Sequence, residues 1–221
     1  MYINIPGLIA VISSFSTLFL VIFYFAKKIV VLKSEIRWIA IYSAYSFINN
    51  YLLDHTSETT NTSLLFIFTI IEYAIFAWLY YSMLHSINSK RAIMFGSFIF
   101  LGIVGFSIMN FSNRAFDNLN SGTEAVLIII YSILFFVERM SAMDIVEPIY
   151  EKAEFWIVLG CFIYLSGNLF LFVTSDLHNQ TAWMINSIFN LVRNVFFFIA
   201  IRKCAIVKKD PGPDKIQSLD W

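Results

Sequence analysis

Long apolar runs constrain this chain more than any other feature of its sequence. Seven stretches are dominated by aliphatic and aromatic side chains, with few charges inside them. They cover Ile5–Ala26, Ile36–Leu53, Ser63–Leu84, Ala92–Phe111, Thr123–Val137, Phe155–Thr174 and Ala182–Ile201. Most approach the roughly 20 residues that a helix needs to cross the hydrocarbon core of a bilayer. The pattern predicts a multi-pass membrane protein, with the lipid bilayer as its first partner.

The apolar character within each run is continuous, which favours helices. The strands of a membrane barrel would instead alternate between apolar and polar side chains over about 10 residues. The composition agrees, since 59% of the residues are hydrophobic and only 14% are charged. We predict an all-α bundle of seven transmembrane helices over residues 1–204. Residues 205–221 are charged and broken by Pro and Gly, so we expect a flexible cytoplasmic tail there.

The basic residues predict how the bundle sits in the membrane. When the loops are assigned alternately to the two sides, all Lys and Arg but two fall on one side. Those on that side are Lys27, Lys28, Lys33, Arg37, Lys90, Arg91, Arg139, Lys152, Arg202, Lys203, Lys208, Lys209 and Lys215. Arg114 falls on the opposite side and Arg193 lies within the seventh run. Because cytoplasmic loops collect Lys and Arg, we expect the N-terminus outside and the C-terminus in the cytoplasm.

The seventh run carries a polar stripe. At about 100° per residue, Asn186, Asn190, Arg193 and Asn194 fall within one arc of about 100° on a helix. A charge at the centre of a bilayer costs about 2.5 to 3.5 kcal/mol on insertion scales. We therefore expect Arg193 to face the interior of the bundle and to have a partner there.

Glu72 is the predicted partner of Arg193. It is the only acidic residue deep within a predicted helix, and its depth from the outer face nearly equals that of Arg193. We predict a contact between these two side chains. Two interpretations remain open at this point: a structural ion pair that fixes packing, or part of a functional site.

Other runs repeat the polar pattern. Tyr42, Tyr45, Ser46 and Asn49 share a face of the second, and Tyr164 and Asn168 share a face of the sixth. The predicted ligand-binding set is Glu72, Arg193, Asn168, Asn190, Asn186, Asn49 and Tyr164. The four asparagines of this set would line a polar cavity above the ion pair, open toward the outside, although each Asn also suits hydrogen bonding between helices. Amides recognise hydrogen-bond patterns without acid or base chemistry, so the set favours recognition, and we expect no enzyme and no catalytic residues.

No signal for a metal, a cofactor or a nucleic-acid partner is present in the sequence. The three histidines do not converge, because His55 and His178 belong to the predicted outer side and His85 to the inner side. Phosphate-binding Gly loops, H-E-x-x-H and G-x-S-x-G are also missing. A retinal protein would need a lysine inside the seventh helix, where this chain has Arg193.

Three stretches carry a resemblance to a known family. They are "IIEYAIFAWLYYSMLHSINSKR" in the third helix, "FWIVLGCFIYLSGNLFLFV" in the sixth and "WMINSIFNLVRNVFFFIAI" in the seventh. They resemble a seven-helix membrane region of bacterial, mainly Bacteroidota-like, proteins that stands alone or is fused ahead of sensor histidine kinases. The residues that match the family pattern are Glu72, Tyr164, Gly167, Asn168, Asn190 and Asn194. The resemblance implies a sensory module in the cytoplasmic (inner) membrane of a bacterium.

Three functions are compatible with these observations. The first is a receptor-like sensor that binds a small molecule. Because no kinase domain follows Ile201, its output would pass to a separate cytoplasmic signalling or effector protein. The second is an oligomeric membrane effector or regulatory accessory of a phage-defence or CRISPR system. The third is a small-solute or proton-coupled transporter, which ranks last because a Glu72 held ionised by Arg193 is a poor proton carrier.

Overall fold

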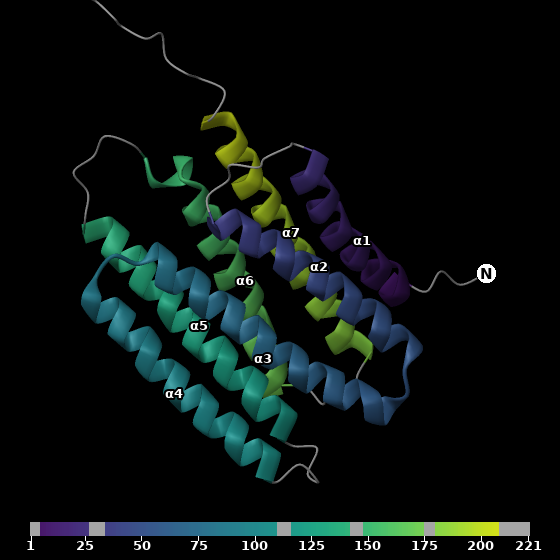
Figure 1. The fold of residues 1–221 in the computed structure, drawn as a ribbon. Coiled ribbons are helices and arrows are strands. Elements are labelled where there is room, and N and C mark those ends of the chain that lie inside the picture. Colours follow the sequence, from purple (N-terminus) through teal and green to yellow (C-terminus); the bar gives the residue numbers. More distant parts are fainter. Residues whose placement is uncertain (1–4, 27–33, 110–115, 142–147, 175–179, 208–221) are drawn as a thin grey trace, which may run out of the picture.

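The structure is a computed structural model that describes residues 5–26, 34–109, 116–141, 148–174 and 180–207 (Figure 1). Within these ranges the chain is all-helical, as predicted. The α-helices are α1 (Ile5–Ala26), α2 (Ser34–His55), α3 (Glu58–Met83), α4 (Ile87–Met109), α5 (Phe116–Ser141), α6 (Ala153–Thr174) and α7 (Gln180–Val207). A short 3₁₀ helix, η1 (Ile149–Glu151), precedes α6.

Six of the described helices are long and apolar enough to cross a membrane: α1 and α3 to α7. Their length and composition indicate a multi-pass membrane protein. The helix α2 has 22 residues, which is a sufficient length, but its sequence is more polar than that of the others. The polar residues that weaken its membrane signal include Tyr42, Ser46 and Asn49, all of which are buried inside the bundle.

The fifth helix departs most from the sequence prediction. We expected it over Thr123–Val137, but α5 begins at Phe116 and ends at Ser141. Its first turns are too polar to be recognised in the sequence as part of a transmembrane helix. Side chains in these turns nevertheless form hydrogen bonds with neighbouring helices. Asn120 Oδ1 accepts a hydrogen bond from Ser107 of α4 (3.0 Å). The helix α7 is also longer than expected, since it continues to Val207, and the rest of the predicted tail (208–221) lies outside the described residues.

Six of the helices form a ring, in the order α1, α2, α3, α5, α6 and α7, with α7 packed back against α1. The helix α4 packs on the outside of this ring against α5 and α3, as its place at one edge of Figure 1 shows. Short connections favour antiparallel neighbours of this kind. The interior of the ring is therefore bounded by side chains from six helices.

Two glycines let α6 and α7 approach closely. A Cβ at Gly160 would lie 3.0 Å from Cβ of Phe196, and a Cβ at Gly167 would overlap the ring of Phe189. Small residues at such positions are typical of helix pairs in membranes, where close van der Waals packing drives association. This contact fixes the position of α7, the helix that carries Arg193, relative to α6.

The outer surface is apolar and the interior is partly polar, as expected for a bundle surrounded by lipid. On α4, Phe95 and Phe98 are more than two-thirds exposed. In contrast, Arg193 is fully buried, and Glu72 and Asn194 are almost so. In lipid, polar side chains are stabilised by facing one another inside the protein.

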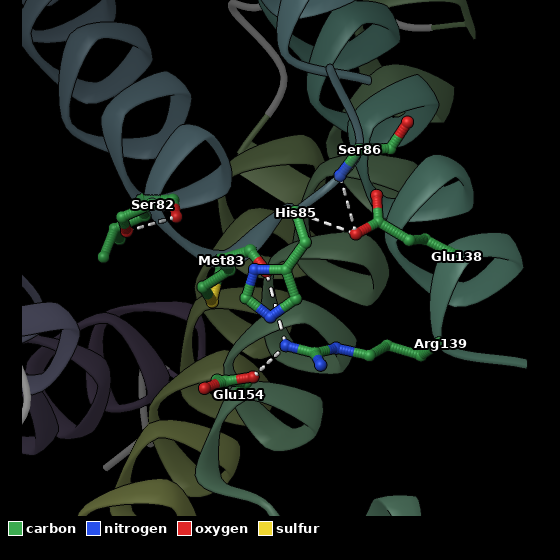
Figure 2. Close-up of polar contacts among 8 residues, drawn as sticks. Ser82, Met83, His85, Ser86, Glu138, Arg139 and Glu154 are labelled. Atoms are coloured by element: carbon green, nitrogen blue, oxygen red, sulfur yellow. Dashed lines mark hydrogen bonds and ion pairs between the residues drawn. The ribbon is translucent and has the colours of Figure 1, made fainter. Parts of the chain in front are cut away.

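Glu138, near the end of α5, caps the start of α4. Its Oε1 accepts hydrogen bonds from the backbone N–H groups of His85 (2.6 Å) and Ser86 (3.1 Å), which directly precede that helix (Figure 2). The first N–H groups of a helix have no partner within it, so an acidic side chain there satisfies them and interacts favourably with the helix dipole. This cap ties the α3–α4 connection to α5.

Arg139 joins three helix ends at the same end of the bundle. Its Nη2 donates to the backbone carbonyl of Met83 at the end of α3 (3.3 Å) and to Oε2 of Glu154 at the start of α6 (2.6 Å; Figure 2). Nearby, Lys203 of α7 forms an ion pair with Glu151 of η1 (2.5 Å). The helix ends that the distribution of basic residues assigns to one side therefore meet at one end of the molecule.

Replacing Glu138 with alanine is expected to destabilise the bundle by about 1 to 2 kcal/mol, because two N–H groups lose a charged acceptor. The melting temperature, followed by tryptophan fluorescence in detergent, measures this loss. Glu138→Gln keeps an acceptor oxygen and should lie between Glu138→Ala and the wild type. Equal melting temperatures for all three proteins would contradict the role of Glu138 as a cap.

Candidate functional site

Arg193 of α7 lies at the centre of the ring and joins three helices. Its Nη1 donates hydrogen bonds to the hydroxyl of Tyr42 on α2 and to Oε1 of Glu72 on α3, the second at 3.5 Å. Its Nη2 donates to Oδ1 of Asn190 and, at 3.4 Å, to Oδ1 of Asn194. The predicted contact between Glu72 and Arg193 is thus present.

Tyr42 bridges this ion pair. Its hydroxyl accepts from Arg193 and donates to Oε1 of Glu72 at 2.5 Å, so the phenol binds both charged groups at once. Hydrogen bonds to ionised partners are about twice as strong as neutral ones, and both of these are buried. The sequence places Tyr42 on the polar face of its helix, but the predicted ligand-binding set does not include it. The sequence signal that could have identified Tyr42 was its position two helical turns from Asn49, on the same face of α2.

Aromatic rings enclose the guanidinium group. Its central carbon lies 4.1 Å from the ring centroid of Tyr164 on α6 and 4.8 Å from that of Tyr42. A cation over a ring face is attracted by the negative charge of that face, by about 2 kcal/mol or more where water is excluded. Tyr164 also interacts with Glu72 and with Asn168, one helical turn away on α6. The helix α6 therefore joins the network through Tyr164.

Hydroxyl groups of α1 extend the network to a further helix, and sequence analysis missed them. Asn194 Nδ2 donates to Oγ of Ser16 (2.7 Å), and Asn50 Nδ2 of α2 lies 3.4 Å from Oγ of Ser14. Ser13 and Thr17 are buried beside them. The available signal was the stretch "SSFST", which places several hydroxyls inside the most apolar run of the chain.

The predicted ligand-binding residues divide into two groups. Glu72, Arg193, Asn190 and Tyr164 come together in the network, and Asn168 adjoins it with its amide buried and its Oδ1 unpartnered. Asn49 and Asn186 do not join them. Asn49 is buried about 10 Å along α2 from Tyr42, and Asn186 is half-buried one turn beyond Asn190. That these residues line a ligand cavity stays a prediction.

A second buried acid corrects the sequence analysis, which took Glu72 as the acid deep within a helix. Glu124 of α5 is only 2% exposed. The prediction was wrong because it began the fifth helix at Thr123, which put Glu124 at a solvated helix end. The earlier start of α5 places it two turns inside the helix.

Within the described ranges, no group of three or more His, Cys, Asp or Glu side chains is arranged to hold a metal ion. His178 lies outside these ranges. Both cysteines, Cys161 and Cys204, are free thiols.

Comparisons with protein-family models, with curated proteins and with solved structures found no significant match. The fold and the site therefore define the class of the protein by themselves: an all-helical, multi-pass membrane protein with a charged and hydrogen-bonded network at its centre.

Proposed function

We propose that this protein is a receptor-like sensor of the bacterial cytoplasmic membrane. In this proposal all seven helices cross the membrane, with the N-terminus outside and the C-terminus in the cytoplasm. A small polar molecule binds beside Arg193, and a separate cytoplasmic protein receives the signal. The position of α2 in the ring between α1 and α3 supports its inclusion as a spanning helix.

Incomplete hydrogen bonding around Arg193 is the observation that carries the proposal. Arg193 Nε, a donor, and Asn168 Oδ1, an acceptor, are both buried and have no partner among the described residues. Both residues contact Tyr164, whose ring lies against the guanidinium group of Arg193 and whose side chain interacts with that of Asn168. Buried polar atoms are nearly always paired in proteins, so two unpaired atoms around one buried guanidinium group point to a missing partner. A small uncharged or zwitterionic ligand could supply an acceptor for Arg193 Nε and a donor for Asn168 Oδ1.

The network also offers a route for a signal. Arg193 holds side chains of α2, α3 and α7, and Asn194 continues to α1. A ligand shifts a conformational equilibrium only if it binds one state more tightly than the other. A ligand that replaces Tyr42 and Glu72 as the hydrogen-bond partner of Arg193 would bind one state more tightly. The contacts between these helices would differ between the two states. The helix ends joined by Arg139 would then transmit the movement to a partner protein.

A thermal-shift screen with small polar metabolites tests the proposal on the purified chain in detergent. A ligand at about 100 times its Kd stabilises the folded state by about 2.7 kcal/mol, which raises the melting temperature by several degrees. We expect Asn168→Ala and Asn190→Ala to remove this shift while the unliganded proteins remain folded. Asn88→Ala, at an exposed position at the start of α4, is the matched control.

Two results would contradict the sensor proposal. One is a shift that persists at full size in both Asn168→Ala and Asn190→Ala. The other is the absence of any stabilising compound together with leakage of dye from liposomes that contain the protein. The second result would instead support the membrane-effector function.

A further inference from the structure

Glu124 is a buried acid that the network around Arg193 does not use. It lies on α5, eight residues or about 12 Å from the start of the helix at Phe116. Its Oε1 is buried and has no hydrogen-bond partner in the part of the chain that the structure describes. An ionised carboxylate in such surroundings would be very unfavourable without a cation, so the charge of Glu124 has to be neutralised.

The register of α3 and α5 places Glu124 level with Glu72. Thr69 Oγ1 of α3 lies 3.2 Å from Oγ of Ser121 on α5. These two helices run parallel. Glu72 lies three residues after Thr69, and Glu124 lies three residues after Ser121. The two carboxyl groups are close enough to interact electrostatically. Two acids therefore share one level of the bundle.

The face of α5 that carries Glu124 lies between α4 and α3, since Tyr131 on this face contacts both helices. Glu124 shares this face with Asn120, one turn before it, and with Tyr131, two turns after it. Asn120 accepts a hydrogen bond from Ser107 of α4, and Tyr131 approaches Gly96 of the same helix. Between residues 92 and 109, α4 has no ionisable side chain. The neighbouring helix thus supplies no charge to balance Glu124.

The charged and titratable groups near Glu124 belong to α3 and α6. They are Glu72 and Tyr73 of α3 and Tyr164 of α6. Arg193, the buried cation among the described residues, directs its hydrogen bonds to Tyr42, Glu72 and two Asn side chains. One guanidinium group can balance one carboxylate. In the described part of the chain, Glu124 is left without a cation.

We propose that Glu124 is a proton-binding site inside the membrane. Its carboxyl group carries the proton while Glu72 stays ionised beside Arg193. Loss of the proton would place a second negative charge level with Glu72, and the two carboxylates would then compete for Arg193. The site would make the central network respond to proton concentration. This inference does not rest on the sensor function, because it requires no ligand other than the proton.

Labelling with the membrane-permeable reagent dicyclohexylcarbodiimide tests the proposal on the wild-type chain. This reagent modifies protonated carboxyl groups in apolar surroundings, and peptide mass spectrometry identifies the site. At about pH 5 we expect Glu124 to be labelled at least about tenfold more than Glu72, with labelling that falls as the pH rises to about 9. Glu124→Gln should remove the label. As a control, the same labelling of protein unfolded in SDS verifies that the peptides carrying Glu72 and Glu124 are both detected.

Two outcomes would overturn the proton site. Glu124 that stays unlabelled at every pH, or is labelled no more than Glu72, would show that it does not hold a proton selectively. Labelling suppressed by sodium chloride but not by choline chloride would assign the site to sodium instead. Because the wild-type protein is used, neither outcome depends on whether a variant folds.

Discussion

Replacement of Arg193 by methionine is expected to destabilise the protein by about 3 to 5 kcal/mol, as for the loss of one partner of a buried ion pair. The reason is that Glu72 and the hydroxyl of Tyr42 would remain buried without the cation that they bind. The melting temperature in detergent, followed by tryptophan fluorescence, measures the effect. Arg91→Met, at an exposed position in the second turn of α4, is the matched control and should change little.

The double variant Arg193→Met with Glu72→Gln separates loss of the charge balance from loss of packing. We expect it to recover much of the stability, because a neutral pair of similar volume replaces the ion pair. The coupling free energy of the double-mutant cycle then measures the interaction. A double variant that is less stable than Arg193→Met alone would show that Arg193 acts mainly by packing against the rings of Tyr164 and Phe197, whose centroids lie 4.1 and 5.7 Å from its central carbon.

Replacement of Gly167 by leucine is expected to destabilise the contact between α6 and α7. Even a Cβ at this position would overlap the ring of Phe189, so the larger side chain forces that ring, and with it α7, to move. Overpacking of this kind costs about 1 to 3 kcal/mol. The melting temperature should therefore fall, and the ligand shift expected beside Asn190 should weaken, because Asn190 follows Phe189 on α7.

Gly102→Leu is the matched control for this variant. A Cβ at Gly102 has no neighbour within 4 Å, and the residue is exposed on α4. Both substitutions raise helix propensity by up to about 1 kcal/mol. The difference between their effects on stability therefore measures the cost of overpacking at Gly167. A Gly167→Leu protein as stable as Gly102→Leu would contradict the close approach of α6 and α7.

The Glu72 to Arg193 contact was predictable because of where these two charges lie. Each is carried by a long apolar run, and a charge in hydrocarbon is unfavourable enough to require a partner. The depth of a residue follows from its distance to the helix end, so two helices that enter from the same face can be compared directly. This reasoning needs no knowledge of which helices are neighbours.

Tyr42 and Glu124 were missed for a different reason. The role of Tyr42 depends on the distance between α2, α3 and α7, which sets whether a phenol fits between the two charged groups. The burial of Glu124 depends on the start of α5, and the polar residues there become helical because they pair with α3 and α4. Such pairings are absent from the local sequence.

The sequence by itself determined that the chain is all-helical, where most of its helices lie, and that Arg193 needs an acidic partner. These properties follow from the length and the period of apolar residues and from the cost of a charge in an apolar medium. Only the tertiary structure decided the bridge through Tyr42, the contacts with α1 and the position of Glu124 level with Glu72. They depend on the register and spacing of helices far apart in the chain, which no single run of residues encodes.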